Sequence, residues 1–401
     1  MQVNSAYIID TVRTPIGKYG GMLSAFRPDD LLAHVISVLV ERNASIDVNA
    51  IEDVIAGAAN QAGEDNRNVA RMAALLAGLP VSVGGNTVNR LCASGLQAIM
   101  DAGRQVMCGD AELIIASGVE SMTRAPFVTG KATAPFQRNT ETFDTTLGWR
   151  FVNKKLASMH HPFSMGETAE NVARQWNISR EEQDAFAFAS QEKYFAAKAA
   201  NKWDEEITGL ELFRDGLVSW IVNDEHPRKT SMEKLAGLKP AFAKEGTVTA
   251  GNAAGINDGA AAMLLASEAA VKKYGLEPMA KIVAMSSAGV DPAIMGIGPV
   301  PATQKVMQRS GLKTSQLGLI ELNEAFASQS IACIRELGLD EKKVNVNGGA
   351  IALGHPLGCS GVRISTTLLY EMRRTGVQYG LATMCVGVGQ GAAIIYENVQ
   401  Q

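Results

Sequence analysis

The sequence predicts an α/β protein whose sheet, mixed or parallel, is covered by helices. In the first third of the chain, short apolar strands alternate with segments that carry apolar residues at helical spacing. The same alternation returns after about Lys281, whereas from residue 122 to 251 the strand signals fade and Thr, Lys, Trp, His and Pro become frequent. These observations favour two similar halves with a long insertion between them.

The first third of the chain supplies strands and helices in alternation. We expect strands at 6–9, 54–58 and 111–117, and helices at 29–41, 68–77 and 92–108. The first of these helices begins with two acidic residues, and the second ends at Gly78 and Pro80, which are typical helix boundaries. This order of elements is the pattern of helices packed on a sheet.

The insertion carries helices of its own. We expect them at 165–175 and 180–200, the second preceded by Ser179, with Glu182 three residues later in the pattern of a capping box. Because insertions on a rigid scaffold often carry binding specificity, we expect this region to contribute to ligand recognition.

The second half repeats features of the first. Strands are expected at 281–285, 319–323, 379–384 and 392–396. Asn60 and Asn323 each follow a strand, and the sequences Cys-Ala-Ser-Gly from Cys92 and Gly-Cys-Ser-Gly from Gly358 open a helix 32 and 35 residues later. We interpret this repetition as a diverged duplication.

Composition excludes several classes of protein. The 401 residues include 37 basic and 41 acidic side chains, so the chain lacks the basic excess that non-specific nucleic-acid binding needs. The five cysteines are scattered without a C-x-x-C pair, which argues against zinc fingers and a disulfide framework and favours a reducing compartment. No run of 18 apolar residues occurs, and the N-terminus lacks signal-peptide features. We therefore expect a cytoplasmic protein with no membrane partner.

Glycine is abundant and charge is scarce. The chain has 39 glycines, and charged residues make up 19%, below the roughly 25% usual in soluble proteins. This composition predicts close contacts between backbone segments and a surface hidden between subunits.

Cys92 is the first candidate for chemistry. It opens an amphipathic helix after a turn-rich run, and the positive end of the helix dipole stabilises a thiolate. We therefore expect its pKa to fall below about 8.5. The alternative is a small cysteine of the core.

Three further candidates lie in the second half. Cys385 precedes the Gly-rich turn Val-Gly-Val-Gly, His355 lies among four glycines and a proline, and Asn323 ends a buried strand. The alternatives are a buried cysteine in a hairpin, a satisfied core histidine and a helix cap. The other three cysteines are interpreted as structural, and no cluster has metal-ligand spacing, so we expect no metal.

Four motifs in this order resemble the thiolase family: Asn-Arg-Leu-Cys-Ala-Ser-Gly from Asn89, Asn-Glu-Ala-Phe-Ala from Asn323, Gly-Gly-Ala-Ile-Ala-Leu-Gly-His-Pro-Leu-Gly from Gly348, and Cys-x-Gly-x-Gly from Cys385. The resemblance implies a five-layered α-β-α-β-α core. It implies an N-terminal half of residues 1–121 plus 252–275, a loop domain of residues 122–251 that binds CoA and the acyl chain, and a C-terminal half of residues 276–401. It also implies CoA thioester substrates, a homodimer or homotetramer, and no permanently bound cofactor.

The resemblance also implies roles for the candidate residues. Cys92 is the nucleophile that carries the acyl group, His355 takes its proton, and Cys385 moves a proton to and from carbon or sulfur. One oxyanion is held by His355 and a water on Asn323, and the other by the backbone N–H groups of Cys92 and Gly387.

Residues implied to bind CoA are Arg228, Ser164, Met165 and Ala254. Ala254 stands where many members have a serine that bonds pantetheine, so we expect that contact to be missing. Ser164 stands where biosynthetic members have histidine, which favours a degradative enzyme. Val388 replaces a glycine that many members have beside Gly387.

Three segments, beginning at Gly63, Thr123 and Phe143, resemble those of thiolases that act on 3-oxoadipyl-CoA. The expected reaction is CoA-dependent cleavage of that 3-oxoacyl-CoA to acetyl-CoA and a shortened acyl-CoA, reversible as Claisen condensation. Because this substrate ends in a carboxylate, a cation is expected in the acyl pocket, with Arg138, Arg150, Lys154 and Lys155 as candidates. The alternatives are a general acetyl-CoA C-acetyltransferase or 3-ketoacyl-CoA thiolase of fatty-acid metabolism, and a non-catalytic thiolase-like lipid-binding protein.

Overall fold

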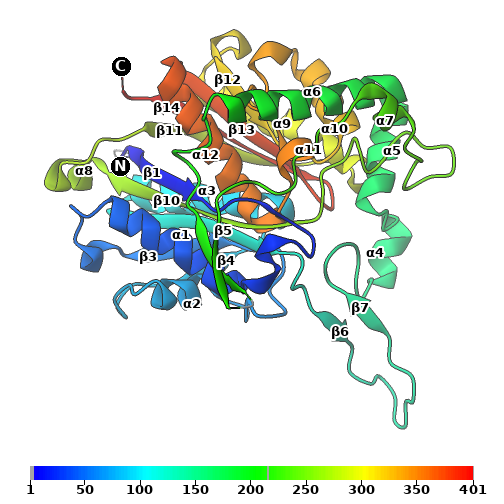
Figure 1. Cartoon of the computed structure of the whole chain (residues 1–401), viewed down its shortest axis with the longest axis horizontal. Helices are drawn as coiled ribbons and strands as arrows, with labels where there is room; N and C mark the ends of the chain where they lie inside the picture. The colour runs from blue at the N-terminus through cyan, green and yellow to red at the C-terminus, as the bar shows by residue number, and fades with distance from the viewer. Residues whose placement is uncertain (1–3, 215, 401) are drawn as a thin grey trace.

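The computed structural model describes residues 4–214 and 216–400 (Figure 1). The elements before residue 122 are β1 (Ala6–Arg13), β2 (Gly17–Lys18), α1 (Pro28–Arg42), β3 (Asp53–Gly57), α2 (Val69–Leu76), β4 (Asn86–Val88), α3 (Ser94–Cys108) and β5 (Leu113–Ser121). Every strand and helix expected there is present, with ends shifted by a few residues.

The middle of the chain and the second half follow in order. Residues 122–251 form β6 (Phe127–Thr129), β7 (Thr142–Asp144), α4 (Lys154–Met159), α5 (Met165–Gln175), α6 (Arg180–Ala199), β8 (Leu210–Arg214), β9 (Leu217–Ile221) and α7 (Met232–Ala236). Then come β10 (Asn257–Ser267), α8 (Glu268–Tyr274), β11 (Ala280–Gly289), α9 (Pro299–Ser310), β12 (Leu319–Leu322), α10 (Ala327–Leu337), α11 (Ala350–Leu353), α12 (Leu357–Thr375), β13 (Tyr379–Val386) and β14 (Gln390–Asn398). The expected capping box at Ser179 and Glu182 begins α6.

Ten of the described strands form a mixed sheet in the order β12-β13-β14-β11-β1-β10-β5-β3-β4, with β2 beside β10, and β6–β7 and β8–β9 form separate hairpins. In the first half β10 pairs antiparallel with β1 and β5, and β5 pairs parallel with β3. In the second half β14 pairs antiparallel with β11 and β13, and β13 pairs parallel with β12. The two halves thus share one strand order, and they meet where Tyr7 lies opposite Lys281.

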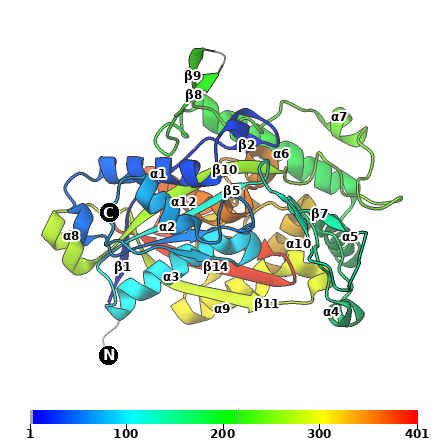
Figure 2. The ribbon, with the colours of Figure 1, turned by 90° about the horizontal axis from the view of Figure 1, so that it is seen from below.

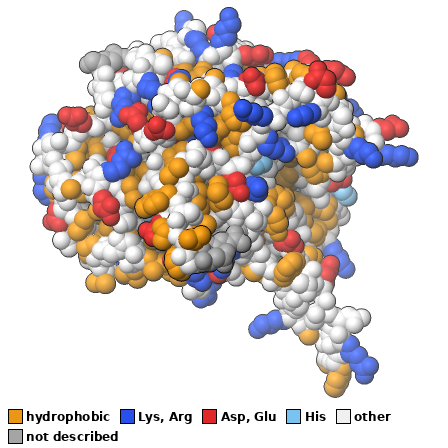
Figure 3. Space-filling view, in the orientation of Figure 1, with side chains coloured by type: hydrophobic (Ala, Val, Ile, Leu, Met, Phe, Trp, Pro, Cys, Tyr) orange, Lys and Arg blue, Asp and Glu red, His pale blue; other side chains and the backbone are white. Residues whose placement is uncertain are grey.

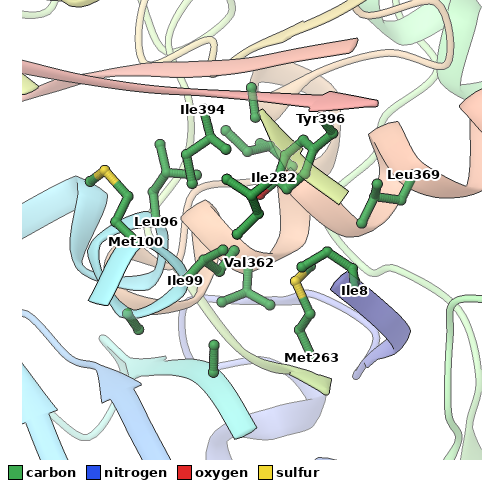
Figure 4. Packing of buried hydrophobic residues seen from close by; sticks show 14 of the residues in the cluster. Ile8, Leu96, Ile99, Met100, Met263, Ile282, Val362, Leu369, Ile394 and Tyr396 are labelled. Atoms are coloured by element: carbon green, nitrogen blue, oxygen red, sulfur yellow. The ribbon is translucent and has the colours of Figure 1, made fainter. Parts of the chain in front are cut away.

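Alternating side chains on the strands separate the layers. On β10, Met263 and Leu265 belong to the core cluster that includes α3 and α12, whereas Leu264 and Ala266 belong to the cluster with α1 and α2. The same alternation on β14 divides residues between the α3/α12 cluster and the cluster with α9 and α10. Because neighbouring strand residues face opposite sides, α3 and α12 lie between the two sheet halves (Figure 4). Helices α1 and α2 cover the outer face of the first half, and α9 and α10 cover that of the second. The expected five layers are confirmed.

Glycines allow α3 and α12 to touch at their first turns. A Cβ on Gly361 would lie 2.0 Å from the backbone nitrogen of Leu96, and one on Gly95 would lie 2.6 Å from the carbonyl oxygen of Gly358. Neither helix start can carry a side chain at these points. The contact brings the residues that precede the two helices into one region, which includes Cys92 and His355.

Two hairpins project from the body of the molecule. The β6–β7 hairpin extends at the lower right of Figure 1, and Figure 3 shows Lys and Arg side chains on this projection. The β8–β9 hairpin projects in the view of Figure 2. Among the described residues, no helix has both the length and the apolar character needed to cross a membrane.

A buried ion cluster joins β1 to the middle of the chain. The Arg13 guanidinium donates to Glu206 at 2.6 Å and to Asp224 at 2.7 Å, and all three side chains are fully buried. The sequence analysis did not single out this cluster, because Arg13 lies 193 and 211 residues before its two partners along the chain.

Candidate active site

A cavity of about 280 Å³ contains Cys92 in its wall. Its lining comes from both halves and from the middle of the chain: Ala59, Asn60, Leu91, Cys92, Glu120, Met122, Ala125, Thr145, Thr146, Leu147, Gly148, Trp149, Arg150, Met165, Leu357, Gly387 and Val388. A mostly apolar cavity with a few polar groups is the usual form of a small-molecule site.

Cys92 lies just before α3 rather than within it. Residues Leu91–Ala93 form a single 3-10 turn, and Leu91 has a φ of 46°. The expectation of a lowered pKa is wrong, since burial raises the pKa of the Cys92 thiol. The backbone N–H groups of Gly387 and Cys92 itself oppose this shift by bonding to the sulfur. The resting side chain is therefore a thiol that faces two N–H donors.

Gly387 begins the turn that connects β13 to β14. The next residue, Val388, has a φ of 61°, and Gly389 has a φ of 79°. A β-branched residue in the left-handed region is strained, because its Cβ crowds the backbone. The turn nevertheless brings the Gly387 N–H to the sulfur of Cys92, where this donor acts to lower the pKa of the thiol.

Cys385 lies at the end of β13 and is completely buried. Burial raises its pKa well above the usual value, and the neighbouring Cys92 raises it further. The two sulfurs therefore belong to one site. Cys385 also packs in an apolar cluster with Met165 and Phe326.

His355 lies between α11 and α12, and 6% of it is exposed. Its Nδ1 atom lies 2.6 Å from the hydroxyl oxygen of Ser360, and that hydroxyl donates to the carbonyl of Pro356 at 2.8 Å. Because a serine hydroxyl has one proton, Nδ1–H of the histidine donates to it and Nε2 keeps a free lone pair. Burial, and then the charge of Arg363, lower the pKa of His355 to about 3. The ring is thus neutral at rest, and Nε2 is the nitrogen with a lone pair that can accept a proton.

Asn323 follows β12 and is completely buried. Its amide nitrogen lies 3.4 Å from Nε2 and 3.5 Å from Nδ1 of His355, so the amide faces the ring rather than one nitrogen. Its Oδ1 atom has no hydrogen-bond partner among the residues described. Asn323 does not cap the following helix, because the cap position of α10 is Phe326 and it has no side-chain cap bond.

Glu120 is a site residue that the sequence analysis missed. Its carboxylate accepts backbone N–H bonds from Ala59 at 2.9 Å, Asn60 at 3.0 Å and Gly358 at 2.8 Å, and so ties the loop after β3 to the start of α12. Burial raises its pKa to about 7. The available signal was Glu120 itself, the one charged residue of the buried strand β5.

The residues expected to bind CoA are spread over the surface of this region. In the described part of the chain, Met165 is the one of the four that lines the cavity. Ser164 caps α5 and forms a capping box with Glu167. Arg228 is exposed and donates to the carbonyl of Ala250 at 3.1 Å, and the backbone of Ala254 donates to Ala325 at 2.9 Å.

Known proteins are similar to this chain in both sequence and fold. The family model described as "Thiolase, N-terminal domain" matches residues 6–269, and "Thiolase, C-terminal domain" matches residues 276–398. The chain belongs to the thiolase family. This thiolase is 55% identical over 401 residues to the 3-oxoadipyl-CoA/3-oxo-5,6-dehydrosuberyl-CoA thiolase of Escherichia coli K12, covering 99% of this chain and 100% of that protein.

Two further comparisons extend this likeness. The thiolase is 56% identical over 396 residues to the beta-ketoadipyl-CoA thiolase of Pseudomonas aeruginosa, covering 98% of this chain and 99% of that one. Its fold matches human mitochondrial 3-ketoacyl-CoA thiolase in complex with CoA with a TM-score of 0.92, 39% identity and 99% coverage of each chain. Sequence and fold therefore agree over the whole length of both halves.

Proposed function

We propose that this thiolase cleaves 3-oxoadipyl-CoA with CoA to give acetyl-CoA and succinyl-CoA, and that it catalyses the reverse Claisen condensation. The observation that carries the proposal is Cys92 in the wall of the cavity, with the backbone N–H groups of Gly387 and Cys92 at its sulfur and the buried Cys385 beside it. The names of relatives that are 55% and 56% identical support this substrate.

The first half-reaction transfers the acyl group to Cys92. His355 accepts the thiol proton at Nε2, and the thiolate attacks the C3 carbonyl carbon. The C2–C3 bond then breaks, acetyl-CoA leaves as its enolate, and the thiol of Cys385 protonates the C2 carbon. Cys92 now carries a succinyl thioester.

The second half-reaction returns the acyl group to CoA. The Cys385 thiolate takes the proton of the incoming CoA thiol, and the CoA sulfur attacks the acyl carbon on Cys92. Cys92 leaves as a thiolate and recovers its proton from His355. The raised pKa of Cys385 keeps it a thiol at rest and makes its thiolate a strong base for the CoA thiol at this stage.

Two groups of donors balance the negative charge that develops on oxygen. The N–H groups of Cys92 and Gly387 serve the carbonyl oxygen of the acyl group on Cys92. The proton that His355 takes to Nε2 makes that nitrogen a donor to the enolate oxygen, together with a water on Asn323. The buried Oδ1 of Asn323, which has no partner among the described residues, supports this second role.

The proposal includes the wider organisation of the enzyme. CoA is assigned to Met165, Ser164 and Arg228 of a loop domain of residues 122–251, and to Ala254 just after it. This domain lies between halves made of 1–121 plus 252–275 and of 276–401. A homodimer or homotetramer is supported by apolar side chains on the two projecting hairpins, of which Phe136 is 97% exposed and Trp220 is 64% exposed. Light scattering on the purified protein tests the oligomeric state.

Thiolysis kinetics test the substrate. We expect a higher kcat/KM for 3-oxoadipyl-CoA than for acetoacetyl-CoA or a medium-chain 3-oxoacyl-CoA. A preference for the uncharged substrates contradicts the proposed substrate. Intact mass after incubation with acetyl-CoA tests the nucleophile: the wild type should gain one acetyl group and Cys92→Ala none, and a full adduct on that variant excludes Cys92.

A further inference from the structure

Among the residues that the structure describes, one basic side chain lines the cavity around Cys92. This residue is Arg150, on the segment that follows β7. The other basic residues considered for a substrate carboxylate, which are Arg138, Lys154 and Lys155, are exposed and belong to no part of this wall. Of the four candidate cations, Arg150 is therefore the one that the structure places in the cavity wall.

No carboxylate of the described residues pairs with Arg150. Among the residues that the structure describes, it forms neither a salt bridge nor a side-chain hydrogen bond, and its side chain is half-buried. Arg124, near the start of the same insertion, differs from Arg150 in being paired, because its guanidinium donates to the Glu64 carboxylate at 2.5 and 2.6 Å. A partly buried guanidinium with five free donors is the group that planar anions bind best.

The segment that carries Arg150 is anchored at two points before that residue. The buried Thr145 hydroxyl donates to the carbonyl of Pro126 at 2.6 Å and accepts from the amide of Asn60 at 2.9 Å. The indole N–H of Trp149 donates to the carbonyl of Phe163 at 3.0 Å. These bonds fix the backbone before Arg150, so little conformational entropy is lost when a ligand binds there.

The rest of the lining offers no second cation and one acid. That acid is Glu120, whose carboxylate is already occupied by three backbone N–H groups. The other lining residues are apolar or neutral. A substrate carboxylate that entered this cavity would lose water, and burial of an unpaired carboxylate is costly.

We propose that Arg150 binds the terminal carboxylate of the 3-oxoacyl chain and thereby selects dicarboxylic over monocarboxylic acyl-CoA. The guanidinium pairs with the carboxylate through two parallel N–H bonds, a geometry that lysine lacks. The inference rests on the proposed function, because it assigns the acyl chain to the cavity that contains Cys92. Both substrates named for the Escherichia coli relative, 3-oxoadipyl and 3-oxo-5,6-dehydrosuberyl, end in a carboxylate.

A pair of matched substrates tests this role. 3-Oxoadipyl-CoA and 3-oxohexanoyl-CoA have the same acyl length and differ by a carboxylate in place of a methyl group. For Arg150→Gln we expect kcat/KM to fall about 30- to 100-fold with 3-oxoadipyl-CoA and less than threefold with 3-oxohexanoyl-CoA. Arg150→Lys should recover part of the loss in kcat/KM with 3-oxoadipyl-CoA. This variant can be compared with the wild type on both substrates if Arg150→Gln does not fold. Arg138→Gln, an exposed cation of the same region, is the control and should match the wild type.

The outcomes distinguish the two proposals. Equal losses with both substrates mean that Arg150 serves the CoA moiety or the fold, and they overturn the inference, as does an unchanged preference in Arg150→Gln. If the wild type itself prefers 3-oxohexanoyl-CoA, the proposed substrate is wrong and the role of Arg150 falls with it. If the wild type prefers 3-oxoadipyl-CoA and Arg150→Gln keeps that preference, only the inference about Arg150 fails.

Discussion

The Nδ1 atom of His355 lies 2.6 Å from the hydroxyl of Ser360, whose own proton is donated to the carbonyl of Pro356 at 2.8 Å. This chain of bonds fixes the tautomer of the imidazole and leaves Nε2 as an acceptor. The serine belongs to the first turn of α12, so the helix that forms the middle layer also orients the proposed base.

Replacement of Ser360 should impair turnover without weakening substrate binding. In Ser360→Ala both tautomers become available, and we expect kcat to fall about tenfold, equivalent to about 1.4 kcal/mol, with KM changed less than twofold. Ser365→Ala is the matched control, because Ser365 lies on the same helix and donates to the carbonyl of Gly361 at 2.9 Å without contact to His355. Steady-state thiolysis measures both variants. Equal effects in the two variants would show that Ser360 acts only through the stability of α12.

The pH dependence of alkylation should identify a neutral resting pair. The pKa of Cys92 is raised by burial and that of His355 is lowered to about 3, so neither group is charged near pH 7. The rate of inactivation by iodoacetamide should therefore rise about tenfold per pH unit from pH 6 to 8. The exposed Cys108 is removed with Cys108→Ser so that intact mass reports the site cysteines. A pH-independent rate below pH 7 would instead indicate a thiolate–imidazolium pair.

Loss of the second cysteine should separate acylation from turnover. We expect Cys385→Ala to accept one acetyl group from acetyl-CoA, while thiolysis and condensation fall at least 10²-fold, since general acid–base groups contribute about 10²–10⁴-fold. Cys333→Ala is the control, because Cys333 is equally buried and packs in the cluster of α9 and α10. Mass spectrometry and steady-state assays check the two steps. Near-normal turnover in Cys385→Ala refutes its role in proton transfer.

Val388 should limit the stability of the turn that carries Gly387. Its φ of 61° is unfavourable for a β-branched residue by about 1–2 kcal/mol. We expect Val388→Gly to raise the free energy of unfolding by about 1 kcal/mol, once the extra entropy of glycine in the unfolded chain is subtracted. Val399 is similarly exposed (37% against 39%) without a positive φ, so Val399→Gly should give no gain. Denaturant unfolding measures the free energy of unfolding of both variants. A lower value for Val388→Gly than for the wild type contradicts the claim that the backbone at Val388 is strained.

The sequence by itself determined the class of fold and the residues with candidate chemistry. Alternation of strands and helices located the two halves, and local signals such as the capping box at Ser179 fixed helix starts, because these depend on neighbours in the chain. The strand β10 (Asn257–Ser267) was not identified. Its eleven residues are all buried and rich in alanine, so they show no alternation of apolar and polar side chains.

Only the tertiary structure decided the pKa of Cys92 and which basic residue of the insertion lines the cavity. Cys92 has the backbone donors expected beside a helix start, but burial outweighs them and raises its pKa, an effect of neighbours that are distant in sequence. The three N–H bonds to Glu120 come from residues 61, 60 and 238 positions away. The sequence gives no reason to prefer one of the four basic residues of the insertion. The folded chain places Arg150 in the wall of the Cys92 cavity. Charge, burial and reach depend on distances through space, and only the packing of both halves sets those distances.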